Sequence, residues 1–370
     1  MEQAKARIEK QMKQILENDK DGDGKISKEE APERLKRNFD RIDRNSDGFV
    51  DRKEIDELGK VLLRNLSRRN KQQNRRPRMP AVPDDVELKK DIAYRGLSES
   101  DSKKDQPKQN PEYWNLDLYL PKEKAEQPRA AIVFVHGGGW RSGDKAGGVW
   151  SAYPIHFAQK GYVCISINYR LSQVAPFPAC VEDCKCAVRW LRANAKKYHI
   201  DPNKIGAYGN SAGAHLVSML GLVQKKDELE GDGPYRNQSS SVQAVCPAAT
   251  PSDFTVWAKQ QLGGKDRLLE GAKESLDARA EKASPVSYAR KDAPPFLIIH
   301  GTADRTVPVD QGKRLAEALT KAGAKHVTLK IYEAAGHGVF RQKEKETLPM
   351  LEKFFDKHLR ADSVKENEND

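Results

Sequence analysis

The stretch KIGAYGNSAGAHLVSML, residues 204–220, decides the fold of most of this chain. An apolar run ends at Gly209 and a helix-forming apolar run begins at Ala212, so the pattern predicts a strand that turns directly into a helix. Ser211 stands at the tip of that turn. A side chain at the glycine on either side would collide with adjacent backbone, so the turn requires small neighbours. The stretch therefore predicts a serine presented on a sharp strand-to-helix turn.

A serine hydroxyl on such a turn needs two partners before it can act as a nucleophile. An imidazole must take its proton, and an acid must hold that imidazole in the correct tautomer. In folds that use this turn, the acid and then the histidine follow later in the chain. Asp304 directly follows the apolar run PFLIIHG, and His337 lies in a glycine-flanked loop after VTLKIYE. We predict a catalytic triad of Ser211, Asp304 and His337, with Asp310 and Glu333 as the lesser candidates for the acid.

The other histidines have no comparable context. His215 lies one helical turn beyond Ser211, where we expect it to pack rather than to react. Stretches that we expect to be solvated contain His199, His326 and His358.

A glycine run supplies candidate donors for the negative charge that develops when a carbonyl is attacked. Residues 133–140, VFVHGGGW, leave an apolar strand and pass through three glycines whose amides are unobstructed. We predict that the amides of Gly138, Gly139 and Ala212 form an oxyanion hole. A phosphate-binding loop is the competing interpretation, and it fails because neither GxxxxGK[ST] nor GxGxxG is present.

Short apolar runs alternate with amphipathic helical patterns from about residue 85 onward, which predicts an α/β fold with a mostly parallel sheet covered by helices on both faces. The predicted strands are residues 130–137, 162–170, 204–209, 242–248, 295–301 and 327–333. The predicted helices are residues 181–198, 212–223, 311–323 and 347–359.

Two acidic loops occupy the beginning of the chain. A calcium loop of twelve residues needs oxygen ligands at positions 1, 3, 5, 7, 9 and 12, with glycine at position 6. DKDGDGKISKEE and DRNSDGFVDRKE both meet this pattern, with Ile26 and Val50 at position 8, as a short strand pairing the loops would require. The predicted ligands are Asp19, Asp21, Asp23, the Lys25 carbonyl, Ser27 and Glu30, and then Asp43, Asn45, Asp47, the Phe49 carbonyl, Asp51 and Glu54. Residues 1–60 thus resemble the EF-hand family, which implies two Ca²⁺ sites in a small all-α domain.

The segment between the loops is too short for two helices and a turn, because only residues 31–42 separate them. We predict one helix that leaves the first loop and enters the second, with Pro32 in its first turn. This arrangement favours structural calcium over a signalling switch. The alternative is a pair of degenerate loops that bind nothing.

Composition divides the chain into four parts. A basic, proline-containing stretch separates the acidic head from the α/β pattern, and few of its residues could pack, so we predict a linker. The predicted parts are an EF-hand pair at 1–60, a linker at 61–84, a catalytic domain at 85–360 and a disordered tail at 361–370.

The net charge of +11 raises the possibility of an anionic partner, but Lys and Arg on solvated helices and in the linker account for it, so we predict no nucleic-acid partner. The sequence contains no apolar stretch long enough for a membrane helix, and we predict no transmembrane segment. Localisation stays open. Calcium sites favour a periplasmic or secreted protein whose leader has been removed, whereas the absent signal peptide and sparse cysteines favour the cytoplasm.

Five cysteines at positions 164, 180, 184, 186 and 246 form an odd, sparse set. CVEDCKC lacks the CxxC pairs of a zinc site, so we expect buried structural thiols. A disulfide and a metal site are the alternatives.

Residues 89–360 resemble the α/β-hydrolase fold, and within it the esterases related to hormone-sensitive lipase and to bacterial feruloyl and acetylxylan esterases. The resemblance is carried by LDLYLP, HGGGWRSGDK, INYRL, AVRWLRANA, GNSAGAHL, SPVSY, PPFLIIHGTADRTVPVDQG and the later GHG. It implies a carboxylic ester hydrolase that works through an acyl-enzyme without a catalytic cofactor. It also implies short acyl esters, or acetyl and feruloyl esters of polysaccharides, as substrates.

The long helical cap of the lipase branch is not evident, although residues 224–290 leave room for a small helical insertion. Trp140, Trp150 and Trp257 are candidates to line a substrate pocket, with apolar core as the alternative.

Two other functions fit parts of the pattern. A prolyl-oligopeptidase-like serine peptidase has a similar catalytic domain, but no propeller repeats precede it here. A calcium-dependent binding or docking protein with a vestigial hydrolase domain is the alternative from a different class.

Overall fold

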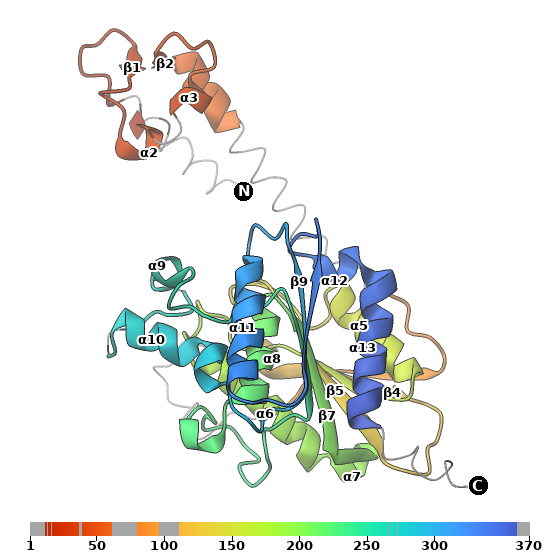
Figure 1. Ribbon diagram of the computed structural model, residues 1–370. Coiled ribbons are helices and arrows are strands. Elements are labelled where there is room, and N and C mark those ends of the chain that lie inside the picture. The colour runs from red at the N-terminus through yellow and green to blue at the C-terminus, as the bar shows by residue number, and fades with distance from the viewer. Residues whose placement is uncertain are drawn as a thin grey trace, which may run out of the picture. The chain divides into compact units, whose positions relative to one another are not determined.

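The computed structural model divides the chain into two compact units, residues 1–78 and 79–370 (Figure 1). The described residues are 12, 14–15, 17–36, 39–60, 80–95, 111–265, 267–271 and 273–360. Most of the predicted linker, residues 61–79, and the predicted tail, residues 361–370, lie outside the described residues. These two predictions stay predictions.

An eight-stranded sheet forms the centre of the larger unit, in the order β10-β9-β8-β7-β5-β6-β4-β3. The strands are β3 (Val86–Ala93), β4 (Asn115–Pro121), β5 (Arg129–Val135), β6 (Val163–Ile167), β7 (Ile200–Asn210), β8 (Ala244–Ala248), β9 (Phe296–Gly301) and β10 (Val327–Tyr332). The strands from β10 to β6 are parallel to their neighbours, and β4 and β3 are antiparallel. The mostly parallel sheet is confirmed, and all six predicted strands are present.

Helices cover both faces of this sheet, as the apolar strands require (Figure 1). They are α5 (Val149–Gln159), α6 (Ala179–Ala193), α7 (Ala195–Tyr198), α8 (Ala212–Leu222), α11 (Val309–Lys321), α12 (Val339–Gln342) and α13 (Glu344–Leu359). Alternate residues of β5 belong to opposite cores. Val133 packs in the cluster that includes α6, α8 and α11, and Ile132 packs in the cluster that includes α5 and α13. None of the described helices is long and apolar enough to cross a membrane.

A small helical insertion lies between β8 and β9, as predicted. It contains α9 (Lys259–Leu262), α10 (Leu276–Ala283) and the 3₁₀ turn η3 (Pro285–Tyr288), while η1 (Pro111–Trp114) and η2 (Lys225–Asp227) lie earlier in the chain. Gln311 on α11 holds the start of the insertion, because its Oε1 accepts hydrogen bonds from the amides of Ser252 and Asp253 at 3.0 and 2.8 Å.

The smaller unit pairs the two acidic loops through β1 (Lys25–Ser27) and β2 (Phe49–Asp51). These strands are antiparallel, with Ile26 opposite Val50, which confirms the predicted pairing at position 8. A small core forms around them, and its buried members include Leu35, Phe39 and Ile55. The predicted single helix is described in two pieces, α2 (Glu33–Lys36) and α3 (Phe39–Ile42). Residues 37 and 38, which would join these pieces, lie outside the described residues.

All five cysteines are buried and free, which confirms the expectation of structural thiols over a disulfide. Burial raises the pKa of the Cys180 thiol to about 12 and that of the Cys186 thiol to about 11. Both side chains therefore remain neutral thiols at ordinary pH.

Asp183 on α6 is the centre of a buried ionic network. Its side chain is fully buried and accepts hydrogen bonds from the Arg170 guanidinium at 2.8 Å and from the Trp114 indole at 3.2 Å. Arg95 lies 3.5 Å from the same carboxylate. The network joins α6 to segments on both sides of β4. Removal of its central anion would leave each guanidinium group with one carboxylate partner among the described residues, Asp232 at 2.6 Å for Arg95 and Glu182 at 3.3 Å for Arg170.

We predict that Asp183→Ala lowers the free energy of unfolding by about 3–5 kcal/mol, the usual cost of breaking a buried ion pair. Urea unfolding of the full chain, followed by tryptophan fluorescence, measures the change. Glu182→Gln is the matched control, because the Glu182 side chain is 22% exposed and meets Arg170 once, at 3.3 Å. Equal losses in the two variants would contradict this role for the network.

Candidate active site

The residues predicted for catalysis all follow strands of the parallel part of the sheet. The glycine run follows β5, Ser211 follows β7, Asp304 follows β9 and His337 follows β10. Because the carboxyl ends of parallel strands meet at one edge of a sheet, residues far apart in sequence converge there.

Ser211 occupies a strained backbone position between β7 and α8. Its φ of 58° and ψ of −123° are rare for a residue with a side chain, and its amide donates to the Ala248 carbonyl at 2.9 Å. A Cβ added at Gly209 would lie 2.3 Å from the Gly213 carbonyl oxygen, and one at Gly213 would lie 2.0 Å from the Val135 carbonyl oxygen. The prediction that a side chain at either glycine would collide with backbone is confirmed.

His337 joins the serine to the acid. Its Nδ1 lies 2.8 Å from Asp304 Oδ2, and its Nε2 lies 2.9 Å from Ser211 Oγ. An ionised carboxylate can only accept, so Nδ1 carries the proton and donates it to Asp304. Nε2 of the neutral ring is then left as the acceptor for the Ser211 hydroxyl. The structure thus brings the three predicted residues together in the tautomer that a general base requires.

Asp304 is held as an anion by its surroundings. Burial raises the pKa of its carboxyl group, but hydrogen bonds from His300, His337 and the Val307 amide outweigh burial and hold that pKa well below its usual range. The amides of Thr306 and Val307 donate to Oδ1 at 2.8 and 2.9 Å. One carboxylate oxygen is therefore taken by backbone, and the other faces His337.

The two lesser acid candidates lie elsewhere. Asp310 is exposed and pairs with Arg314 at 2.6 Å on the surface of α11. Glu333 is exposed and accepts a hydrogen bond from Thr302 at 3.1 Å. Within the described part of the chain, neither has His337 as a partner.

His300 is a part of this site that the sequence did not reveal. It is fully buried at the end of β9, and its Nε2 lies 3.0 Å from the Val307 carbonyl and 3.5 Å from Asp304 Oδ2. Because the carbonyl can only accept, Nε2 carries the proton and faces the acid. The only feature of the sequence that could have indicated this role is a histidine near the end of an otherwise apolar strand.

The glycine run lies against the serine turn. A Cβ at Gly137 would be 3.4 Å from the Ser211 Cβ, so the two segments are in direct contact. Gly138 and Gly139 both have positive φ, at 123° and 61°, and form a tight turn closed by the Arg141 and Ser142 amides on the Gly138 carbonyl. No group within the described residues accepts a hydrogen bond from the amides of Gly138, Gly139 or Ala212.

A buried lysine anchors the far end of this loop. The Lys145 ammonium lies 2.7 Å from carboxylate oxygens of Asp117 and Asp91, and the Lys145 amide donates to Asn168 at 2.7 Å. Burial lowers the pKa of Lys145, but the bonds to Asp117 and Asp91 outweigh it and raise the pKa. The Lys145 charge therefore ties the loop to β4 and β3, and the Lys145 amide ties it to Asn168, directly after β6.

The predicted tryptophans differ in burial. Trp140 is buried and packs edge-on against His215 and Phe254, while Trp150 and Trp257 are partly buried against the cores. His215 is fully buried, as the expected packing role requires.

The acidic loops of the smaller unit have equivalent internal hydrogen bonding. Glu30 accepts from the Lys20 and Ser27 amides at 3.0 and 2.9 Å, and Glu54 accepts from the Arg44 and Asp51 amides at 2.7 and 3.1 Å. These are positions 2 and 9 of each loop. Hydrogen bonding to Ser27, and after it to Lys20, lowers the pKa of Glu30 to about 2.

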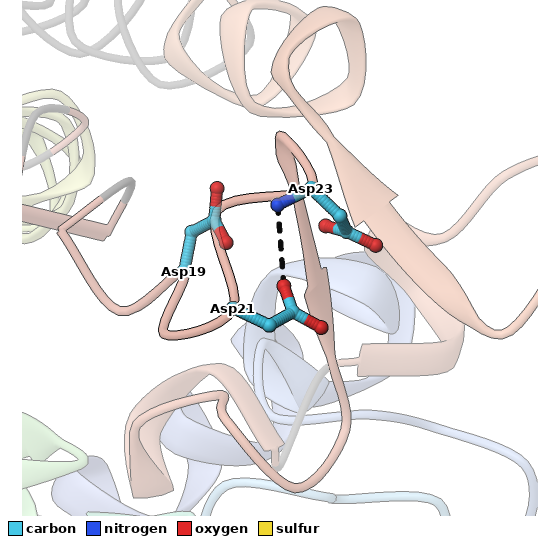
Figure 2. Close-up of side chains that lie close together, drawn as sticks. All are labelled: Asp19, Asp21 and Asp23. Carbon is cyan, nitrogen blue, oxygen red and sulfur yellow. Dashed lines mark hydrogen bonds between the residues drawn. The ribbon is translucent and has the colours of Figure 1, made fainter.

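Carboxylates gather inside the first loop, as Figure 2 shows. Oxygens of Asp19, Asp21 and Asp23 lie within 4.8 Å of one another, and the Asp23 amide donates to Asp21 at 3.2 Å. Gly24 and Gly48, at position 6 of the two loops, have φ of 81° and 85° with open space around them. The donor set is oxygen throughout, which is the chemistry that Ca²⁺ prefers.

Comparisons with known proteins concern the larger unit. The sequence profile of the BD-FAE family matches residues 116–319, a range that includes Ser211 and Asp304 and ends before His337. Esterase LipC of Mycobacterium tuberculosis is 31% identical over 233 residues, which are 60% of this chain and 56% of LipC.

Two solved structures have the same fold. A truncated carbohydrate esterase from gut microbiota is 28% identical with a TM-score of 0.62, over 74% of this chain and 96% of that one. A propionate-bound esterase from the planctomycete Thermogutta terrifontis is 28% identical with a TM-score of 0.57, over 76% and 96%. These likenesses support an α/β-hydrolase fold for the larger unit. The chain spans about half the length of the curated relatives that it matches.

We predict that Gly213→Ala lowers the free energy of unfolding by about 1–3 kcal/mol, because the added carbon must displace rigid backbone. Thermal unfolding followed by circular dichroism measures the change. Gly264→Ala is the matched control, since its added carbon meets only the Arg267 side chain at 3.7 Å. A Gly213→Ala protein as stable as the control would contradict the packing described for the turn.

Proposed function

Because the chain belongs to the BD-FAE family, we propose that it is a carboxylic ester hydrolase whose catalytic triad is Ser211, His337 and Asp304. The single observation that carries this proposal is the double hydrogen bonding of His337, at 2.8 Å to the acid and 2.9 Å to the serine. A histidine held on both sides in this tautomer is ready to remove the serine proton. The esterase relatives favour ester hydrolysis over peptide hydrolysis.

The reaction passes through an acyl-enzyme. His337 Nε2 takes the proton of Ser211 Oγ as that oxygen bonds to the ester carbonyl carbon, and the Asp304 carboxylate stabilises the resulting imidazolium. The proton then passes to the departing alcohol as the C–O bond breaks. Water, deprotonated by the same histidine, attacks the acyl-enzyme and releases the acid.

The amides of the glycine run stabilise the negative charge that develops on the carbonyl oxygen. The amides of Gly138, Gly139 and Ala212 have no acceptor among the described residues, and Ala212 is the first residue of α8, where amide groups are unpaired within the helix. Each well-placed donor of this kind lowers the barrier by about 3 kcal/mol.

We propose that the substrates are esters of short acyl groups, or acetyl and feruloyl esters carried by polysaccharides. Support comes from the propionate bound to the Thermogutta esterase and from the carbohydrate esterase among the similar structures.

We also propose that the smaller unit is an EF-hand pair that binds two Ca²⁺ ions. The equivalent hydrogen bonding of Glu30 and Glu54, the positive φ at Gly24 and Gly48 and the pairing of β1 with β2 support this proposal. The residues that would hold the ions are Asp19, Asp21, Asp23, Lys25, Ser27 and Glu30 in the first loop, and Asp43, Asn45, Asp47, Phe49, Asp51 and Glu54 in the second. Calcium would offset the repulsion among these carboxylates and stabilise the unit.

We predict that Asp304→Asn lowers kcat for p-nitrophenyl acetate by about 10⁴-fold, because an amide no longer fixes the proton of His337 on Nδ1. Ser211→Ala should abolish turnover while leaving the circular dichroism spectrum unchanged. Asp310→Asn is the matched control and should keep wild-type activity, since Asp310 pairs only with Arg314 among the partners found for it. If the Ser211→Ala protein retained most of its activity, Ser211 could not be the nucleophile.

Calcium removal should affect stability and activity differently. We predict that Ca²⁺ at 100 times the dissociation constant stabilises the smaller unit by roughly 2.7 kcal/mol for each site that it fills. Chelation should leave turnover of a small ester within about twofold, because the predicted linker would separate the modules. Calorimetry and p-nitrophenyl acetate kinetics of the full chain, with and without chelator, measure both effects. A variant with Glu30→Gln and Glu54→Gln should lose the calcium-dependent shift, and a collapse of turnover on chelation would contradict the independence of the modules.

A further inference from the structure

Trp140, the residue directly after the three glycines, holds an unfavourable backbone conformation. Its φ of 57° lies in the left-handed region, which is unfavourable for a residue with a side chain and persists only where the surroundings enforce it. The Trp140 carbonyl accepts a hydrogen bond from the Ser172 amide at 2.8 Å. The indole supplies a second constraint, at the other end of the residue.

The Trp140 indole is the start of a buried chain of hydrogen bonds. Its Nε1 donates to His215 Nδ1 at 3.1 Å, and His215 Nε2 lies 2.8 Å from the Ala283 carbonyl. The indole nitrogen can only donate and the carbonyl can only accept, so His215 has one possible tautomer, with its proton on Nε2. Burial lowers the pKa of His215 to about 4, so the ring is neutral at ordinary pH.

This chain joins the glycine loop, α8 and the helical insertion. Trp140 belongs to the glycine loop, His215 lies one turn along α8 from Ser211, and Ala283 ends α10 of the helical insertion. Phe254 closes the cluster, with ring centroids 5.7 Å from Trp140 and 5.2 Å from His215. His215 is fully buried and Trp140 is 4% exposed, so a broken hydrogen bond could not be replaced by bulk water.

We propose that His215 is a positioning residue for the oxyanion hole. By accepting from Trp140, it fixes the turn that aims the Gly138 and Gly139 amides, and by donating to Ala283 it ties that turn to the insertion. His215 acts through Trp140 and does not itself touch the reacting atoms. The inference rests on the proposed ester hydrolysis, and it assigns a task to a histidine that the triad leaves unused.

Three substitutions separate the two hydrogen bonds of His215. His215→Leu removes both. His215→Asn places an amide oxygen where Nδ1 stood and so keeps the acceptor for Trp140, whereas His215→Gln places an amide nitrogen where Nε2 stood and keeps only the donor to Ala283. We expect His215→Leu and His215→Gln to lower kcat by about tenfold or more at unchanged KM, a part of the roughly 100- to 1,000-fold that loss of one oxyanion donor costs. His215→Asn should retain most of kcat.

Hydrogen–deuterium exchange provides a readout that needs no substrate. The peptide covering residues 133–142 should exchange faster in His215→Leu and His215→Gln than in His215→Asn. If the wild-type chain fails to hydrolyse esters, the proposed function falls, and the exchange pattern still decides whether His215 holds the loop.

Ser218→Ala is the matched control for lost stability. Ser218 is fully buried one turn further along α8, and its hydroxyl donates to the Ala214 carbonyl at 2.8 Å, within the same helix. It should lose stability but keep kcat. Trp140→Phe serves if His215→Leu does not fold, because it removes the indole donor and keeps an aromatic ring. It should reproduce the His215→Gln phenotype.

A double variant tests whether the two residues act as one. Trp140→Phe combined with His215→Gln should be no slower than either single variant, because both remove the same hydrogen bond. The proposal is overturned if the two effects on kcat multiply, or if His215→Leu keeps wild-type kcat and loop exchange. It is equally overturned if His215→Gln retains as much kcat as His215→Asn.

Discussion

Close backbone packing around Ser211 is the constraint on which the rest of this site depends. The turn from β7 into α8 leaves no room for a Cβ at Gly209 or Gly213, and the glycine run after β5 is pressed against the same turn at Gly137. Three backbone segments therefore touch without intervening side chains. Ser211 keeps its strained conformation within this contact, and the glycine run lies against its turn. His337 and His215 depend on this packing, because it fixes the positions of Ser211 and of the glycine loop that includes Trp140.

Two chains of hydrogen bonds, each through one histidine, lead outward from this packing. In the first, the buried anion Asp304 holds the proton of His337 on Nδ1 and frees Nε2 for Ser211. In the second, the donor-only indole of Trp140 and the carbonyl of Ala283 hold the proton of His215 on Nε2. The two tautomers differ because Nδ1 of His337 faces an acceptor, the Asp304 carboxylate, whereas Nδ1 of His215 faces a donor, the Trp140 indole. His337 is partly exposed, whereas burial keeps His215 neutral at ordinary pH.

The interior of the fold could be predicted because its signals are local. The strands from β5 to β10 are short apolar runs, and the glycines on either side of Ser211 indicate the sharp turn. The edge strand β3 was not predicted, because VELKKDIA is largely polar and its strand character comes only from pairing with β4. The three predicted catalytic residues could be chosen from chain order, since each of them follows a strand. His300, the Lys145–Asp117 pair and the tautomer of His215 could not be predicted, because their partners are chosen by tertiary packing. In the smaller unit the loop pattern fixed the pairing of Ile26 with Val50 in advance.

The central claim is that Ser211 forms a covalent acyl-enzyme with an ester substrate. Rapid mixing of the full chain with p-nitrophenyl acetate, acid quenching and intact-protein mass spectrometry test it most directly, with peptide mapping to locate the adduct. We predict a transient mass increase of one acetyl group on the peptide that contains Ser211, formed as a burst in the wild-type protein. The acetylated form should accumulate in His337→Ala if that variant slows deacylation more than acylation. An acetyl group found only on another residue, or steady ester turnover by the Ser211→Ala protein, would contradict it.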